Sequence, residues 1–108
     1  MNDIIVVVTG GFDPLHSGHI AYFKEAKKLG NKLIVGINSD AWLTKKKGSP
    51  FLPFNERLEI VSNIDVVDEA IGFEDDELNS AADAISQTIQ RYPNNKIVFA
   101  CLLYTSDA

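Results

Sequence analysis

Apolar runs and amphipathic segments alternate along the first third of the chain. Residues 3–9 contain Ile-Ile-Val-Val-Val, a β-branched run typical of a strand buried on both faces of a parallel sheet. Over residues 18–29, apolar side chains recur at helical spacing with lysines between them, and Gly30-Asn31 follows as a stop signal. The inward-facing positions of this predicted helix are Ile20, Phe23, Ala26 and Leu29. Residues 33–37 form a second apolar run, so the three segments predict one right-handed βαβ unit.

The pattern after this unit predicts a long connection and then a helix. We expect residues 38–53 to be irregular because Gly48, Pro50 and Pro53 interrupt them, and long ordered connections are often functional. A helix is predicted over residues 55–64, with Asn55 as its N-cap. Its inward-facing positions are Leu58, Ile60 and Val61.

Two more strands and one more helix complete the predicted fold. Residues 66–73 are strand-like but carry Asp68 and Glu69, so one end of this strand should be exposed. An acidic turn over residues 74–77 suits the N-terminus of a helix predicted over residues 77–91. The apolar positions of that helix are Leu78, Ala81, Ala82, Ile85 and Ile89. Residues 96–100 form the fourth strand, and the alternation of strands with helices predicts an α/β fold with a doubly wound parallel sheet.

Length and charge narrow the functional classes. A chain of 108 residues has room for one domain. Its formal net charge of −5 and the lack of a basic stripe argue against nucleic acid as a partner. No apolar run approaches the ~20 residues that cross a bilayer, and the N-terminus lacks a secretory signal, so we expect a cytoplasmic protein with no membrane partner. Cys101 alone supports neither a disulfide framework nor a cysteine zinc site.

The chemistry of the chain concentrates in the loop after the first predicted strand. This loop runs Thr9-Gly10-Gly11-Phe12-Asp13-Pro14-Leu15-His16-Ser17-Gly18-His19. In open α/β sheets, ligands bind at the carboxyl ends of strands where the strand order reverses. Paired glycines let the backbone approach a phosphate closely, and the N-terminus of the following helix offers unpaired N–H groups and a partial positive charge. These features predict a phosphate-binding loop.

Two imidazoles flank a glycine at the start of the predicted helix. His16 and His19 are three residues apart, so both side chains should lean over one spot, and we expect Gly18 to leave room there for a phosphate. The imidazoles could then donate hydrogen bonds to phosphate oxygens as negative charge builds up in a transition state. Two histidines are two ligands short of a zinc site, so no metal site is predicted. The glycine spacing differs from the dinucleotide fingerprint, which argues against a redox Rossmann domain.

The segment from Gly11 to His19 resembles the signature of the cytidylyltransferase-like nucleotidyltransferases, and the resemblance runs from about Ile4 to Ala100. Three further segments are similar to the family: Gly36-Ile37-Asn38-Ser39-Asp40, Lys45-Lys46-Lys47-Gly48 and Asn55-Glu56-Arg57. The first of these segments, together with Val67-Asp68-Glu69 and Phe73-Glu74-Asp75-Asp76, is most similar to the glycerol-3-phosphate cytidylyltransferase and heptose-1-phosphate adenylyltransferase groups. The resemblance implies a Rossmann-like fold and transfer of CMP or AMP from CTP or ATP, with Mg²⁺, to a phosphorylated polyol, sugar or amino alcohol, with release of pyrophosphate.

The resemblance also implies roles for individual residues. The catalytic residues would be His16, His19 and Lys46. The nucleotide-binding residues would be Thr9, Gly10, Gly11, Phe12, Asp13, His16, Gly18 and His19. The phosphate of the second substrate would be held by Lys45, Lys46, Lys47 and Arg57. The implied partners are a nucleoside triphosphate and a phosphorylated small molecule; related enzymes are often homodimers, so a second copy of the chain is also considered.

Simpler interpretations stand beside these assignments. A run of three lysines is more often a solvated helix face than a site, and Arg57 is by residue type most often a surface residue. Asp13 can form a turn with Pro14 instead of contacting a nucleotide. Trp42 can stack on a base or cover the core. Many cytidylyltransferases have Thr where this chain has Gly11, so a hydroxyl contact would be missing.

The last eight residues, from Cys101 to Ala108, match the translation of a transposon-end adaptor used in sequencing libraries. We therefore interpret residues 1–100 as an incomplete nucleotidyltransferase domain and residues 101–108 as a non-native tail; a natural strand end followed by a turn is the alternative. The family's Ser/Thr-rich motif, which grips the triphosphate, is absent and would lie beyond Ala100. The alternative function is a non-catalytic nucleotide-binding module or an inactive fragment, which predicts nucleotide-dependent stabilisation without pyrophosphate release.

Overall fold

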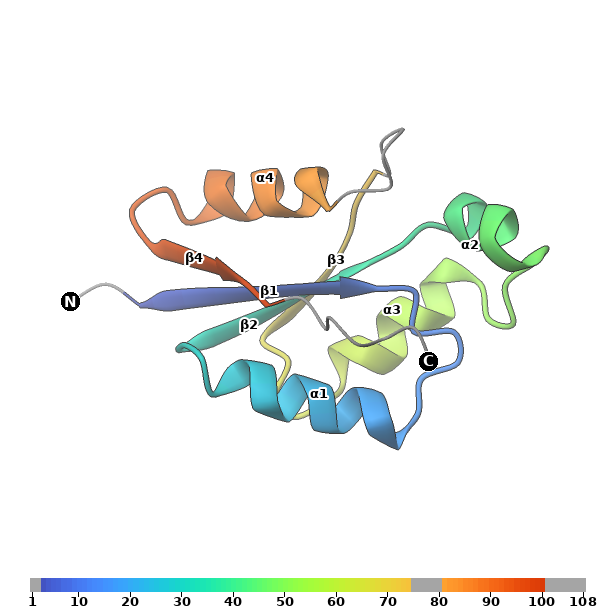
Figure 1. Cartoon of the computed structure of the whole chain (residues 1–108), viewed down its shortest axis with the longest axis horizontal. Helices are drawn as coiled ribbons and strands as arrows, with labels where there is room; N and C mark the ends of the chain where they lie inside the picture. Colours follow the sequence, from blue (N-terminus) through green and yellow to red (C-terminus); the bar gives the residue numbers. More distant parts are fainter. Residues whose placement is uncertain (1–2, 75–80, 101–108) are drawn as a thin grey trace.

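Four parallel strands form one sheet, and helices cover both of its faces in the computed structural model of the chain (Figure 1). The structure describes residues 3–74 and 81–100. The strands are β1 (Ile4–Gly10), β2 (Lys32–Ile37), β3 (Glu69–Gly72) and β4 (Lys96–Phe99). The helices are α1 (Ser17–Lys27), α2 (Asp40–Lys47), α3 (Phe54–Ser62) and α4 (Ala82–Arg91). The predicted α/β fold with a doubly wound parallel sheet is confirmed.

The strand order β3-β2-β1-β4 places β1 and β2 at the centre of the sheet. Each of the three strand pairs is parallel. From β1 the chain adds β2 and β3 on one side and then returns through α4 to add β4 on the other, so the strand order reverses between β1 and β4. Helices α1 and α3 cover one face and α4 the other (Figure 1). The carboxyl end of β1 is therefore the switch point at which ligands of such sheets bind.

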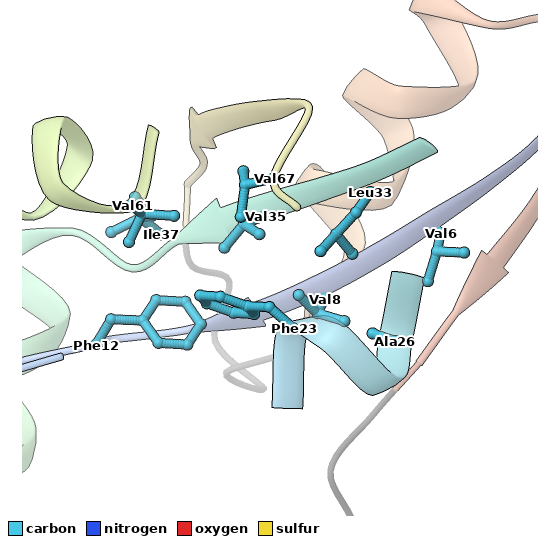
Figure 2. Packing of buried hydrophobic residues seen from close by; sticks show 10 residues of the cluster. All are labelled: Val6, Val8, Phe12, Phe23, Ala26, Leu33, Val35, Ile37, Val61 and Val67. Atoms are coloured by element: carbon cyan, nitrogen blue, oxygen red, sulfur yellow. The ribbon is translucent and has the colours of Figure 1, made fainter. Parts of the chain in front are cut away.

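Two apolar clusters, one on each face of the sheet, hold the layers together. The larger cluster packs the sheet against α1 and α3 (Figure 2). Its buried members are Val6, Val8, Phe12, Phe23, Ala26, Leu33, Val35, Ile37, Val61 and Val67. The smaller cluster consists of Ile5, Ile34 and Ile71, with Tyr92 and Ile97 packed against it. Successive side chains of a strand point to opposite faces, so a strand covered on both sides is apolar at successive positions, as β1 is from Ile4 to Val8.

The connection after β2 contains a helix that the hydrophobic pattern did not predict. We expected irregular chain over residues 38–53, but α2 occupies Asp40–Lys47. Its N-cap is Ser39, whose side chain accepts a hydrogen bond from the Trp42 amide, and its C-cap is Gly48 at a φ of 94°. These are ordinary start and stop signals for a helix. The helix escaped prediction because Leu43 is its one buried residue and, apart from the half-buried Trp42, its other residues are polar or exposed.

The boundaries of two predicted helices are wrong, and with them some predicted buried positions. Helix α1 ends at Lys27, so Leu29 lies beyond it and is 55% exposed. Helix α3 runs from Phe54 to Ser62 rather than over residues 55–64, with Pro53 rather than Asn55 at the N-cap position. Ile60 is exposed, whereas Val61 is fully buried as predicted. Proline takes the cap position because it has no N–H to leave unpaired and its fixed φ suits a helix entry.

Helix α4 packs on the sheet through small residues rather than the predicted isoleucines. Ala84 and Thr88 are buried, whereas Ile89 is 50% exposed. A Cβ added to Gly36 in β2 would lie 3.2 Å from the Cβ of Ala84, so the helix approaches the sheet closely at this glycine. Dense packing at that distance admits only small side chains. Close approach, not hydrophobicity, therefore sets the buried face of α4.

Two other expectations depend on segments that are only partly described. Strand β3 is shorter than predicted and begins at Glu69, after a turn that brings the Asp68 amide to the Leu33 carbonyl. Residues 75–80 of the expected acidic turn and helix, including Leu78, lie outside the described residues, as do residues 101–108. Within residues 3–74 and 81–100, no helix has the length and apolar character needed to cross a membrane.

Candidate active site

The loop between β1 and α1 lies at the switch point of the sheet, where the sequence placed the candidate chemistry. β1 ends at Gly10 and α1 begins at Ser17, so six residues cross the carboxyl edge of the sheet. Helix α2, which follows β2, lies at the same edge (Figure 1). The Gly10 carbonyl accepts a hydrogen bond from the Asn38 amide, which ties the ends of the two central strands together. The histidine loop and the lysine-bearing helix thus face one region.

His16 and His19 cap the N-terminus of α1 reciprocally. The Nδ1 atom of His16 accepts a hydrogen bond from the Gly18 amide at 3.0 Å, and the Nδ1 atom of His19 accepts one from the His16 amide at 3.1 Å. The two rings stack with centroids 3.9 Å apart and planes at 29°. Such a capping box satisfies two of the unpaired donors of a helix start. The expectation that both imidazoles lean over one spot is therefore confirmed by the geometry.

This arrangement determines which ring nitrogen carries the proton. Because each Nδ1 accepts a hydrogen bond, the neutral imidazole must hold its proton on Nε2. Each ring therefore presents an Nε2–H donor, and both donors belong to stacked rings at the positive end of a helix dipole. A pair of N–H donors at a helix N-terminus is suited to a phosphate group. Neither ring needs to be charged to play this part.

Gly18 lies directly beside the His16 ring. A Cβ added at Gly18 would lie 2.8 Å from Cε1 of His16 and 3.0 Å from its Nδ1. The glycine therefore makes room for the His16 ring. This explains the glycine of the His-x-Gly-His motif in physical terms. A side chain at position 18 would displace the His16 ring from its hydrogen bond at the start of α1. The paired glycines before the loop are also covered, Gly10 by the Phe12 ring and Gly11 by Leu43.

The Phe12 ring packs against the histidine pair through His19. It is 6% exposed, and its ring makes edge-to-face contacts with His19 at 5.2 Å and with Phe23 at 5.1 Å. Figure 2 shows the rings of Phe12 and Phe23 side by side in the larger core cluster. The backbone of Phe12 has a φ of 53°, a left-handed conformation that is rare for an aromatic residue. Burial of the ring in the core holds this unusual turn in place.

The stability of the protein should depend on the protonation of His19. Its pKa is lowered from the ordinary value of 6.5, first by burial and then by repulsion from His16. The unfolded chain therefore binds this proton at a higher pH than the folded chain, and the free energy of unfolding should fall as the pH drops below about 6.5. Denaturant unfolding at pH 7.5 and 5.5 measures the effect. His19→Gln, which can keep the capping bond without titrating, should show a smaller pH-dependent loss; an equal loss in both proteins would contradict this role.

Asp13 joins the histidine loop to the segment after α2. Its side chain is 1% exposed; one oxygen accepts hydrogen bonds from the Phe51 amide at 2.6 Å and the Lys47 ammonium at 2.7 Å, and the other from the Leu52 amide at 2.8 Å. Burial opposes ionisation, but the bonds from Lys47 and the two amides hold the pKa of Asp13 below its usual value. The carboxylate is engaged within the protein, which favours the structural interpretation over a nucleotide contact.

The three lysines are not equivalent. Lys47 is tied to Asp13 through both its carboxylate and its carbonyl oxygen, and its ammonium lies 4.3 Å from the Phe51 ring centroid. Lys45 and Lys46 are exposed in the last turn of α2, and the ammonium of Lys46 lies 5.2 Å from the Trp42 ring centroid. Of the lysines that the sequence nominated for a phosphate, Lys45 and Lys46 are thus presented to solvent, whereas Lys47 is committed to an internal ion pair.

Arg57 is not a surface residue. Its side chain is fully buried, and its guanidinium forms an ion pair with Asp40 at 2.6 Å. It also donates to three carbonyl oxygens, of Leu52 at 3.0 Å, Gly11 at 3.0 Å and Asn38 at 2.7 Å. The interpretation of Arg57 as a surface residue is therefore wrong. Sequence reasoning named neither Asn38 nor Asp40 as a partner of Arg57; the one available signal was the Ser39 cap, which would have placed Asp40 at the start of a helix.

Gly11 packs closely against α2. A Cβ at this position would lie 2.9 Å from Cδ2 of Leu43, a buried residue. Gly11→Thr, which installs the residue found in many cytidylyltransferases, should therefore lower the free energy of unfolding by about 1–3 kcal/mol. Chemical denaturation of Gly11→Thr and of the double variant Gly11→Thr/Leu43→Ala measures this. The double variant should lose less stability than the sum of the losses of Gly11→Thr and Leu43→Ala, because alanine at position 43 leaves room for the threonine. Strict additivity of the two losses would show that the contact does not exist.

A pocket of about 290 Å³ opens beside the site, at the carboxyl ends of β2 and β3. Its lining consists of Ser39, Asp40, Phe54, Gly72, Phe73, Glu74, Asp83 and Gln87. Three of these side chains are acidic, and one of them, Asp40, is paired with Arg57. Among the described residues, no group of three or more His, Cys, Asp or Glu side chains is arranged to hold a metal ion.

A doubly wound parallel sheet that carries His-x-Gly-His at its switch point belongs to the class of α/β nucleotidyltransferase domains. The chain is a member of the cytidylyltransferase-like family, whose model matches residues 7–106. The bifunctional protein HldE of Erwinia tasmaniensis is 43% identical over 74 residues, which cover 67% of this chain and 16% of that protein. HldE of Proteus mirabilis is 42% identical over 74 residues, which again cover 67% of this chain and 16% of that protein. The chain thus spans about a sixth of the length of these relatives.

Solved structures agree with this assignment. A lipopolysaccharide core biosynthesis protein from Thermoplasma volcanium superposes with a TM-score of 0.68 at 31% identity, covering 91% of this chain and 96% of that one. A protein of unknown function from Archaeoglobus fulgidus gives a TM-score of 0.62 at 22% identity, covering 100% of this chain and 93% of that one. The second likeness concerns the fold alone.

Proposed function

We propose that the protein transfers a nucleoside monophosphate from CTP or ATP to a phosphorylated sugar, polyol or amino alcohol and releases pyrophosphate. The observation that carries this proposal is the reciprocal cap, in which His16 and His19 each direct Nδ1 to the backbone and keep Nε2–H as a donor. Two N–H donors at a helix N-terminus match the needs of a triphosphate whose charge shifts during the reaction.

The reaction is a displacement at the α-phosphorus. An oxygen of the acceptor's phosphate forms a bond to the α-phosphorus while the bond from that phosphorus to the bridging oxygen of pyrophosphate breaks. The Nε2–H groups of His16 and His19 stabilise the negative charge that grows on the α-phosphate and the leaving group. The exposed ammonium groups of Lys45 and Lys46 attract the phosphates of both substrates. No covalent intermediate with the protein is needed.

Magnesium is expected to arrive with the nucleotide. The histidines offer nitrogen rather than the oxygen ligands that Mg²⁺ prefers, and the Asp13 carboxylate is occupied by Lys47 and two amides. Mg²⁺ in such sites is usually held by substrate phosphates with few protein ligands. When bound, it would neutralise part of the triphosphate charge, while the residues of this chain orient the phosphates.

A sugar phosphate is the acceptor class we favour. The Thermoplasma relative is a lipopolysaccharide core biosynthesis protein, and lipopolysaccharide cores are built from sugars. The pocket beside the site, with acidic side chains such as Glu74 and Asp83 and the amide of Gln87, offers acceptors for sugar hydroxyl groups. The choice between CTP and ATP is part of the proposal to be tested, as is assembly into a homodimer.

The test is a pyrophosphate-release assay with ATP and with CTP, each offered with Mg²⁺ and a panel of hexose, heptose and polyol phosphates. We expect release with one nucleotide that depends on one acceptor class. Thermal denaturation with each nucleotide is run in parallel. Stabilisation by a nucleotide without pyrophosphate release for any acceptor would support the alternative, a non-catalytic nucleotide-binding module.

A further inference from the structure

Arg57 lies beneath the candidate nucleotide loop rather than on its open side. One of its terminal nitrogens, Nη1, donates to the Gly11 carbonyl at 3.0 Å and to the Asn38 carbonyl at 2.7 Å. These carbonyls belong to the residues that directly follow β1 and β2. The side chain is fully buried, and Nη2 is paired with Asp40. The guanidinium thus bridges the two strand ends from inside the protein.

The hydrogen bond from Arg57 to the Gly11 carbonyl also sets the direction of the Phe12 N–H. A trans peptide unit is planar, and its N–H points opposite to its C=O. The Gly11–Phe12 peptide is not cis. Because Arg57 holds the Gly11 carbonyl toward the interior, the Phe12 N–H is turned away from Arg57. An amide fixed in this way at the carboxyl edge of a sheet is a preorganised donor for a phosphate oxygen.

This peptide needs a restraint because the residue after it is strained. Phe12 has a φ of 53°, a conformation that non-glycine residues adopt at a free-energy penalty and keep only where surrounding contacts fix it. The Phe12 ring is held by the core, and Arg57 holds the peptide before it. Backbone and side chain of the turn are therefore fixed independently.

We propose that Arg57 is a positioning residue that orients the Phe12 amide toward the nucleotide's phosphates, and not a ligand of the acceptor's phosphate. The assignment rests on the proposed nucleotide site. Asp40 completes the device: its carboxylate is 46% exposed and fixes the guanidinium through Nη2 at 2.6 Å. A lysine at position 57 would keep the charge but could not reach the same set of carbonyls at once, because its donors radiate from a single nitrogen.

The experiment compares Arg57→Lys with Arg91→Lys, a matched change at the chain's other arginine, which pairs with Glu69. In the nucleotide-free protein, Arg57→Lys should shift the carbonyl ¹³C resonance of Gly11 and the amide resonance of Phe12, whereas Arg91→Lys should leave both in place. In the transfer reaction, Arg57→Lys should raise the KM for the nucleotide about tenfold or more and leave the KM for the phosphorylated acceptor within about threefold. Asp40→Asn, which keeps a neutral acceptor, should give the same pattern more weakly and serves if Arg57→Lys does not fold.

The outcomes separate this inference from the proposed function. A rise in the acceptor's KM with the nucleotide's unchanged would make Arg57 an acceptor ligand and overturn the inference. A loss of thermal stability with both KM values unchanged would also overturn it, since Arg57 would then be merely structural. If the wild-type protein binds neither MgATP nor MgCTP, the proposed function fails. In that case the chemical shifts of Gly11 and Phe12 alone test the orienting role of Arg57. Unchanged shifts in a folded Arg57→Lys variant would overturn that role.

Discussion

Replacing either histidine of the reciprocal cap by alanine should lower kcat by about 10²–10³-fold, the usual effect of removing one preorganised donor to a transition-state charge. His16→Ala and His19→Ala each remove one Nε2–H donor from the stacked pair. Because each also removes a hydrogen bond to the backbone at the start of α1, both variants should lose about 0.5–2 kcal/mol of stability. Steady-state pyrophosphate release, measured well below the melting temperature of each variant, gives the kinetic effect.

His16→Asn separates capping from catalysis. Asparagine is a favoured N-cap residue, and its carboxamide oxygen can accept the hydrogen bond that the Gly18 amide now donates to His16. The variant should therefore retain nearly all of the wild-type stability while losing activity as severely as His16→Ala. A kcat for His16→Ala within about threefold of wild type would show that the imidazole has no catalytic part.

The second large effect is expected at Asp13. Asp13→Ala should lower the free energy of unfolding by about 2–4 kcal/mol, because it leaves the Phe51 and Leu52 amides and the Lys47 ammonium without the carboxylate that they share. A domain of this size has a total stability of about 5–15 kcal/mol, so this is a large fraction. Urea or guanidinium denaturation followed by circular dichroism measures the change.

Asp68→Ala is the matched control for this prediction. Asp68 also accepts hydrogen bonds from a lysine and a backbone amide, those of Lys27 at 2.6 Å and Leu33 at 2.7 Å, but its side chain is 39% exposed. Water can replace those bonds, so the loss should be smaller, about 1 kcal/mol. Equal losses at the two positions would mean that burial does not make the Asp13 contacts more important. Both carboxyl groups have lowered pKa values, so both contributions should fade as the pH falls below about 3.8.

The elements that could be predicted from the sequence are those with local causes. The β-branched run of β1 predicts a strand covered on both faces, and the spacing of His16 and His19 predicts that the rings meet, because three residues make nearly one helical turn. Each inference needs only the geometry of one element. The structure bears out both, with the ring centroids 3.9 Å apart.

The features that could not be predicted arise from contacts between distant segments. Nothing local to Lys47 distinguishes it from Lys45 or Lys46; its difference arises because Asp13, 34 residues away, comes to lie beside it. Arg57 occupies a polar helix position in the sequence, yet it is buried beneath the ends of β1 and β2. There it donates hydrogen bonds to the carbonyls of Gly11 and Asn38. The packing of α4 through Ala84 likewise depends on Gly36 in a different element. Cationic residues near a motif are thus poor guides to ligand contacts until their internal partners are known.

Transfer at the α-phosphorus to a phosphorylated acceptor can be followed with labelled nucleotide. The protein is incubated with Mg²⁺, an acceptor sugar phosphate and the nucleotide labelled in either the α- or the γ-phosphate, and the products are separated. We expect the α label to enter a product joined to the sugar phosphate and the γ label to leave in pyrophosphate. Transfer of the γ label to the acceptor, or release of labelled inorganic phosphate regardless of the acceptor, would contradict this expectation.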